Sequence, residues 1–214
     1  MTVLTRELLE DAFVDLGRRA KAEGKTIDLA VYGGSALILA SNFRAATADV
    51  DAVAQLDQAT VDRLAKEIAR DRQWADDWLN DGVRTFLSPS VDGIAQHHGL
   101  FRAYPNDDDP GLRVFVPSAE YMLALKLAAL RVDPARGAKD RDDIKNLLKI
   151  VGISTAEEAA AFTAAFFPEY ATSSRLYPRF LAQLLDFFAD GIEPTGSPHY
   201  TAEEAEPSKP MPKG

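Results

Sequence analysis

The hydrophobic and polar positions along the chain follow first a helical spacing and then a strand-like run. Apolar side chains recur every three to four residues between residues 4 and 22, which predicts an amphipathic helix: Leu8, Leu9, Phe13 and Leu16. Gly24 ends this pattern, and residues 27–32 form a short apolar run that is typical of a buried strand. The chain therefore opens with a helix that is followed by a strand.

The rest of the first half continues to mix the two periods. Clusters of turn residues separate the apolar segments from one another. These segments predict helices at 35–41 and 59–71 and strands at 49–54, 83–87 and 112–116. The fold class that we expect is α/β (α+β), with a small mixed sheet and its helices in the first half of the chain.

From residue 118 onward the pattern becomes helical. Apolar spacing and capping residues predict four helices, at 119–132, 138–150, 155–166 and 174–189. Ser154 and Glu157 are spaced as a capping box for the third of these helices. After Ile192 the chain is rich in proline and poor in apolar residues. We expect an α/β core over residues 1–117, a helical region over 118–191 and a disordered tail over 192–214.

Composition narrows the class of protein. The chain has 214 residues, of which 46% are hydrophobic, so a packed core is expected. It contains no cysteine, which excludes a disulfide framework and a thiolate metal site. Neither a signal-peptide core nor an apolar run of membrane-spanning length is present. We therefore expect a cytoplasmic protein that has no membrane partner.

The charge is acidic overall but unevenly distributed. A net charge of −9 argues against a broad surface that coats nucleic acid. Between residues 126 and 149, however, seven lysines and arginines outnumber four aspartates. Six of these cations form a candidate basic cluster that would attract a phosphate-rich ligand: Arg131, Arg136, Lys139, Arg141, Lys145 and Lys149.

The break between the strand at 27–32 and the next helix has the chemistry of a phosphate site. Gly33 and Gly34 allow the backbone to approach a ligand closely, and the helix start offers unpaired N–H groups to an anion. Ser35 follows them and is expected to contact phosphate. The alternative role for Ser35 is a plain helix cap, which leaves the N–H groups facing the same ligand.

Two aspartates begin the next predicted strand. Thirteen residues separate Ser35 from Asp49, and Asp51 shares a strand face with Asp49 while Val50 points to the core. Two carboxylates a few ångströms apart repel each other by roughly 4 kcal/mol at an effective dielectric constant near 20. A divalent cation between them removes that repulsion, so Asp49 and Asp51 are candidate ligands for Mg²⁺. The alternative is a pair of solvated acids at an exposed strand end.

The helical half contributes one lysine and two aspartates. Lys126 lies among apolar neighbours, which is costly unless the ammonium meets an anion or extends to water. Asp140 and Asp143 are three positions apart and share a helix face. We expect Lys126 to meet an anion. The alternatives are a solvent-reaching Lys126 and aspartates that merely favour a helix N-terminus.

These residues together resemble a known superfamily. Gly34-Ser35 followed by Asp49-x-Asp51 is similar to the Gly-Ser…Asp-x-Asp signature of nucleotidyltransferases, which include DNA polymerase beta-like enzymes. Arg44 and Thr47 before the aspartates, Lys126 in a later helix, and the segment from Lys139 to Ile144 resemble abortive-infection type nucleotidyltransferase toxins.

The resemblance implies a role for each candidate residue. Asp49 and Asp51 would hold Mg²⁺ and act in catalysis together with Lys126. The nucleotide would be bound by six residues: Gly33, Gly34, Ser35, Lys126, Asp140 and Asp143. The predicted strands at 83–87 and 112–116 lack the third carboxylate that many members carry, and Asp92, Asp140 or Asp143 are candidates to replace it.

The implied reaction transfers a nucleoside monophosphate from an NTP to a hydroxyl group. The acceptor implied by the resemblance is the 3′ end of a tRNA, with the protein acting as a toxin that has a cognate antitoxin. Other acceptors are a small molecule such as an antibiotic, or a protein. An alternative of another class is a catalytically silent nucleotide-binding module.

Three other groups of polar or aromatic residues favour structural roles. Trp74 and Trp78 are four positions apart, as in a core or lid contact. The acidic run at 107–109 precedes Pro-Gly and predicts a solvated turn. His97 and His98 lack partners at metal spacing, so we expect surface or loop histidines.

Overall fold

A five-stranded mixed sheet forms the centre of the first half. The computed structural model describes residues 3–91, 93–130, 138–194 and 196–201, although not the side chains of residues 138 and 139. The strands are β1 (Ile27–Tyr32), β2 (Val50–Ala54), β3 (Leu79–Asn80), β4 (His98–Tyr104) and β5 (Leu112–Pro117). Their spatial order is β3-β2-β1-β5-β4. The β1–β5 and β2–β3 pairs are parallel, whereas the β1–β2 and β4–β5 pairs are antiparallel. The expected fold class is therefore confirmed.

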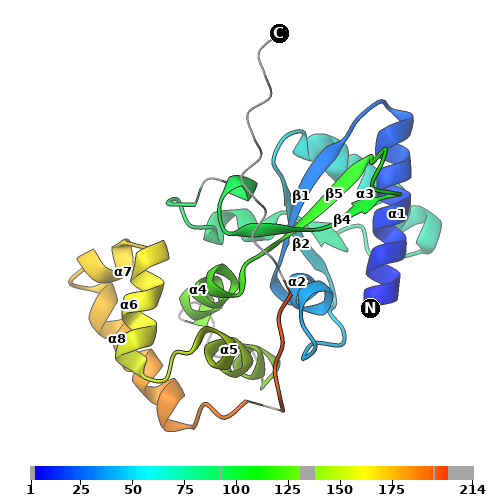
Figure 1. The fold of residues 1–214 in the computed structure, drawn as a ribbon. Helices are drawn as coiled ribbons and strands as arrows, with labels where there is room; N and C mark the ends of the chain where they lie inside the picture. Colours follow the sequence, from blue (N-terminus) through cyan, green and yellow to red (C-terminus); the bar gives the residue numbers. More distant parts are fainter. Residues whose placement is uncertain (1–2, 92, 131–137, 195, 202–214) are drawn as a thin grey trace.

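Three helices cover this sheet (Figure 1). They are α1 (Arg6–Ala22), α2 (Gly33–Ala40) and α3 (Gln58–Arg72). Helices α1 and α3 pack on each other, and the apolar stripe of α1, including Phe13 and Leu16, is fully buried. Helix α2 starts directly at the end of β1 and packs against β2. This arrangement fixes the junction between β1 and α2, where the glycines lie.

The second half is helical and lies beside the sheet (Figure 1). Its helices are α4 (Ala119–Leu130), α5 (Ala138–Val151), α6 (Ala156–Phe166), α7 (Glu169–Thr172) and α8 (Leu176–Ala189). Helix α4 packs against α5 and α6, and α6 packs against α8. The capping box of α6 is formed by Thr155 and Glu158, not by Ser154 and Glu157 as predicted. In the described ranges no helix has both the length and the apolar character needed to cross a bilayer.

The predicted strand at 83–87 is wrong. Residues Gly82–Phe86 form a short 3₁₀-helix, η1, and the sheet is instead extended by β3, just before it. None of the η1 residues is buried. Val83 and Phe86, which have β-forming side chains, line a cavity instead of joining the sheet, so tertiary context overrides strand propensity here.

Strand β4 was not predicted, and it contains one of the two adjacent histidines. His98 is only 3% exposed and begins β4, so the expectation of a surface histidine is wrong there. Trp78 confirms the core alternative, because its ring is buried and its Nε1 donates to the Ala65 carbonyl at 2.9 Å. Trp74 packs edge-on against it.

The segment after α8 returns to the core instead of leaving it. Tyr200 pairs with Ser41 in an isolated β-bridge, and its hydroxyl donates to the Pro117 carbonyl at 2.7 Å. The Thr201 amide donates to the Ala40 carbonyl at 2.8 Å, at the end of α2. The expectation of a disordered tail is therefore wrong for residues 196–201. Residues 202–214 lie outside the described ranges.

Candidate functional site

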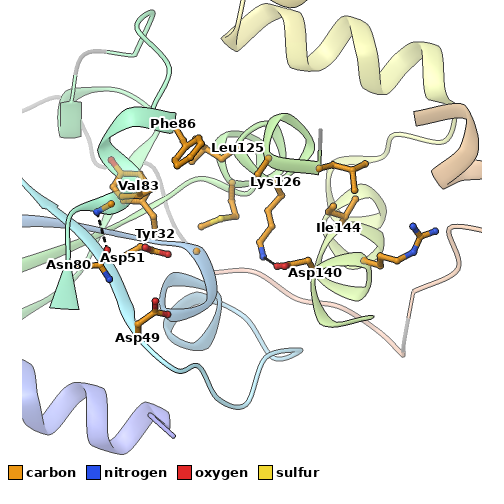
Figure 2. A pocket seen from close by; sticks show the side chains of 16 residues that line it. Tyr32, Asp49, Asp51, Asn80, Val83, Phe86, Leu125, Lys126, Asp140 and Ile144 are labelled. Atoms are coloured by element: carbon orange, nitrogen blue, oxygen red, sulfur yellow. Dashed lines mark hydrogen bonds and ion pairs between the residues drawn. The ribbon is translucent and has the colours of Figure 1, made fainter. Parts of the chain in front are cut away.

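A cavity of about 380 Å³ lies where the sheet, η1 and the helical half meet (Figure 2). This size is within the range of small-molecule sites. Its sheet wall consists of Tyr32, Gly33, Asp49, Asp51 and Asn80. The η1 residues Gly82, Val83 and Phe86 form its rim. Its helical wall consists of Met122, Leu125, Lys126, Ala129, Leu130, Asp140, Arg141 and Ile144.

The two glycines at the start of α2 are needed for different contacts. Gly33 has a φ of +62°, and a Cβ atom there would lie 2.7 Å from the Asp51 carboxylate. A Cβ on Gly34 would lie 2.8 Å from Thr47 Oγ1 and 3.2 Å from the Arg44 guanidinium. Glycine therefore lets the start of the helix approach the acidic strand and the loop that precedes it.

Ser35 neither lines the cavity nor caps α2. Its hydroxyl is buried and donates to the Tyr32 carbonyl at 2.9 Å. It is not among the cavity residues, and the N-cap position of α2 is Tyr32, which makes no side-chain capping bond. The end of α2 that borders the cavity is thus the backbone at Gly33, not the serine side chain.

The two aspartates share the cavity face as strand alternation predicts. Asp49 immediately precedes β2, and Asp51 lies within it, opposite Tyr32 on β1 and Asn80 on β3. Val50, between them, is fully buried. Asp49 and Asp51 therefore point toward the same cavity from consecutive positions on one strand face (Figure 2).

The sheet wall presents two carboxylates, those of Asp49 and Asp51, to the cavity. Within the described residues no three acidic, histidine or cysteine side chains cluster as a metal site. Mg²⁺ is usually bound by one or two carboxylates and completes its shell with water and substrate phosphates. Asp49 and Asp51 fit that pattern. Asp92, a candidate third carboxylate, lies outside the described residues.

Lys126 meets anions, and they are carboxylates of the protein itself. Its ammonium lies 2.7 Å from Asp140 Oδ1 and 2.8 Å from Asp143 Oδ2, and its side chain is only 12% exposed. The solvent-reaching alternative is therefore wrong. Figure 2 shows Lys126 and Asp140 together on the helical wall, facing the aspartates of the sheet wall across the cavity.

Asp143 connects the helical half to the core. Its side chain is 3% exposed, and Oδ2 also accepts a bond from Arg44 Nη1 at 2.7 Å. Arg44 comes from the loop between α2 and β2, which is the loop that packs over Gly34. Asp143 does not line the cavity, in contrast to Asp140, so its contacts are with the two cations that surround it.

Tyr32 lines the cavity, which the sequence pattern did not predict. His98 Nδ1 donates to the Gln96 carbonyl at 2.7 Å, so its Nε2 accepts from the Tyr32 hydroxyl at 3.0 Å. Burial lowers the pKa of His98 from 6.5 to about 4 and raises the pKa of the Tyr32 phenol. A neutral histidine therefore fixes the ring of Tyr32 beside Gly33. The position of Tyr32 just before the two glycines is the feature of the sequence from which its place in the cavity could have been predicted.

The candidate basic cluster is described only in part. Arg131, Arg136 and the side chain of Lys139 lie outside the described structure. Arg141 lines the cavity, but its guanidinium pairs with Asp190 at 2.6 Å and lies over the Phe187 ring. Lys145 is half-buried and Lys149 is exposed, one turn apart on α5.

Comparison with known proteins gives no match, whether to family models, to curated proteins or to solved structures. The chemistry of the cavity is therefore what indicates a function.

Proposed function

We propose that the protein is a Mg²⁺-dependent nucleotidyltransferase that moves a nucleoside monophosphate from an NTP to a hydroxyl acceptor. The observation that supports this best is that groups suited to a triphosphate meet in one cavity. Asp49 and Asp51, the start of α2 at Gly33, and Lys126 come from separate parts of the chain and line one cavity. Carboxylates for a metal, a helix start and a cation are the groups that a triphosphate needs.

The sheet wall would bind the metal and the phosphates. Asp49 and Asp51 are the residues that would hold Mg²⁺, which supplies charge stabilisation on the phosphate oxygens when it is bound. The backbone N–H groups at the start of α2 would face the same phosphates, because Gly33 brings the helix start next to Asp51.

The helical wall would supply the opposing cation. Lys126 is held by Asp140 at the cavity surface and by Asp143 behind it, so its ammonium is oriented before a ligand arrives. A phosphate oxygen would share the ammonium with these carboxylates. Because a preorganised cation costs little reorganisation during the reaction, it stabilises the charge that develops on the leaving pyrophosphate.

The reaction is a displacement at the α-phosphorus. The acceptor oxygen forms a bond to that phosphorus, the bond to the α,β-bridging oxygen breaks, and the hydroxyl proton is released to solvent. Pyrophosphate leaves, and the nucleoside monophosphate remains on the acceptor. The chain positions the reactants and their charges and forms no covalent intermediate in this scheme.

The acceptor that the family resemblance suggests is the 3′ end of a tRNA, which would make the protein a toxin with a cognate antitoxin. A second candidate acceptor is a small molecule with a hydroxyl group. It is favoured by the net charge of −9 and by the pairing of the cavity residue Arg141 with Asp190, which removes a cation from RNA.

Labelled transfer tests the proposal. The protein would be incubated with each α-labelled NTP, Mg²⁺ and total RNA, and separately with small-molecule fractions. We expect label on one acceptor together with pyrophosphate release, and loss of both in Asp51→Asn. Asp108→Asn, in the exposed turn at 107–109, is the matched control and should remain active. Absence of any Mg²⁺-dependent NTP turnover or binding in the wild type would refute the proposal.

A further inference from the structure

The end of the cavity that lies away from Asp49 is apolar. Val83 and Phe86 on η1 border it on one side, and Met122 and Leu125 on α4 border it on the other. Figure 2 shows Phe86 next to Leu125, across the cavity from Asp49. Phe86 is 50% exposed although it lies against this apolar wall. A large aromatic ring is thus presented at the rim of the cavity and not buried in the core.

This apolar end is continuous with the groups that suit a triphosphate. Asn80 pairs with Asp51 in the β2–β3 register, and η1 begins two residues after Asn80. The chain therefore passes directly from the acidic end to the aromatic rim. An NTP whose phosphates lie at Gly33, Asp51 and Lys126 would extend its nucleoside along the same cavity.

We infer that this apolar end holds the nucleobase of the NTP, with Phe86 as the ring on which the base stacks. The inference rests on the proposed function. It adds that selection among nucleotides depends on the size of the base and not on hydrogen bonds to its edges.

Three polar side chains that line the cavity already have partners within the protein. Asn80 Oδ1 accepts from the Gly82 amide at 3.0 Å, and the Tyr32 hydroxyl is bonded to His98. Arg141 is directed to Asp190. The side chains of Val83, Phe86, Met122 and Leu125 have no N–H or O–H group. The side chains that border this end therefore offer a base apolar surface and an aromatic ring.

Apolar contact discriminates weakly between ligands. A hydrophobic pocket separates similar ligands by about 10- to 200-fold, whereas a site that reads hydrogen bonds reaches about 10⁴-fold or more. Purines present a larger stacking surface than pyrimidines. We therefore expect ATP and GTP to bind with affinities within about tenfold of each other, and both to bind more tightly than CTP and UTP.

Calorimetric titration separates the base from the phosphates. The probes are Mg²⁺ with tripolyphosphate and Mg²⁺ with the α,β-methylene analogues of ATP, GTP, CTP and UTP, which cannot transfer the nucleotide. The variants are Phe86→Ala and Phe86→Trp, with Leu100→Ala as the control. Leu100 lies on β4 and does not line the cavity, and it is exposed to the same 50% as Phe86.

The expected result is a selective loss. Phe86→Ala should weaken binding of the purine analogues by about 5- to 150-fold and leave tripolyphosphate binding unchanged. Phe86→Trp should keep or tighten analogue binding, and Leu100→Ala should behave as the wild type. Unchanged analogue affinity in Phe86→Ala, or selectivity of more than about a thousandfold for one base, would overturn this inference while leaving the proposed function standing. A wild type that binds neither tripolyphosphate nor any analogue would overturn both.

Discussion

The sheet wall of the cavity is held by backbone pairing, whereas the helical wall is held by buried ion pairs. Asp51 is fixed by the register of β2 with β1 and β3. Lys126 is fixed by two carboxylates, one of which also binds Arg44. Backbone pairing is insensitive to single side-chain changes, but a buried charge that loses its partner is strongly destabilising. The two walls should therefore respond differently to substitution.

Substitution of Asp143 should show the dependence of the helical wall on ion pairs most strongly. Asp143→Asn removes the charge that Lys126 and Arg44 share in a buried position, so we expect a loss of about 3–5 kcal/mol in the free energy of unfolding. Asp142→Asn is the matched control, since Asp142 is the exposed neighbour on the same helix. Denaturant unfolding of both variants measures the effect. Equal stability of the two variants would show that the ion pairs do not hold the helical wall.

Acid pH tests the packing behind the sheet wall. His98 has a pKa of about 4 in the folded chain and an ordinary value of 6.5. Between these values the unfolded chain binds a proton at His98 that the folded chain does not bind. The free energy of unfolding should therefore fall by about 3 kcal/mol as the pH decreases from 6.5 to 4. Stability curves of His98→Gln should lack this component, whereas those of His97→Gln should keep it. Parallel curves for the wild type and His98→Gln would contradict the assignment.

Substitution of Gly33 tests whether the close approach of α2 to Asp51 is needed for nucleotide binding or only for the turn between β1 and α2. Gly33→Ala places a residue at a φ of +62° and a methyl group against Asp51. Gly24→Ala introduces the same backbone strain at a φ of +70° with no atom within 4 Å. Both variants should lose about 1–2 kcal/mol of stability, but only Gly33→Ala should also lose Mg²⁺-dependent nucleotide binding. Equal binding in the two variants, measured by calorimetry, would assign Gly33 to the turn alone.

Tyr200 gives the smallest expected effect. Tyr200→Phe removes the hydroxyl that donates to the Pro117 carbonyl at the end of β5, and we expect a loss of about 1 kcal/mol. Tyr177→Phe, at a more exposed position on α8, serves as the control and should change the free energy of unfolding by less. A Tyr200→Phe variant as stable as the wild type would mean that the returning segment adds nothing through this bond.

Local periodicity explains what could be predicted from the sequence. Strand alternation put Asp49 and Asp51 on one face, and apolar spacing predicted α1 and α3. The apolar neighbours of Lys126 indicated that it meets an anion or extends to water, and the structure shows the anion. The identity of that anion depends on contacts between α4 and α5 and with the loop at Arg44, which are distant in sequence. Spacing along the chain contains no information about such contacts.

The predictions that were wrong also failed because of contacts between residues distant in sequence. Val83 and Phe86 have strand-forming side chains, but these side chains line the cavity and do not join the sheet. His98 and Arg102 interrupt the apolar pattern of β4, which is a strand because it pairs with β5. The prolines after Ile192 suggested disorder, yet the Tyr200 hydroxyl donates to the Pro117 carbonyl at the end of β5. In each case a tertiary contact outweighs the local composition.

Nucleotide binding should require both walls of the cavity. This requirement is measured by titrating α,β-methylene ATP in Mg²⁺ into the wild type, Asp51→Asn, Lys126→Met and the control Asp108→Asn. We expect saturable, Mg²⁺-dependent binding by the wild type and the control, and affinity weakened by at least about tenfold in each of the other two variants. Wild-type affinity in either Asp51→Asn or Lys126→Met, or no binding by the wild type, would contradict it.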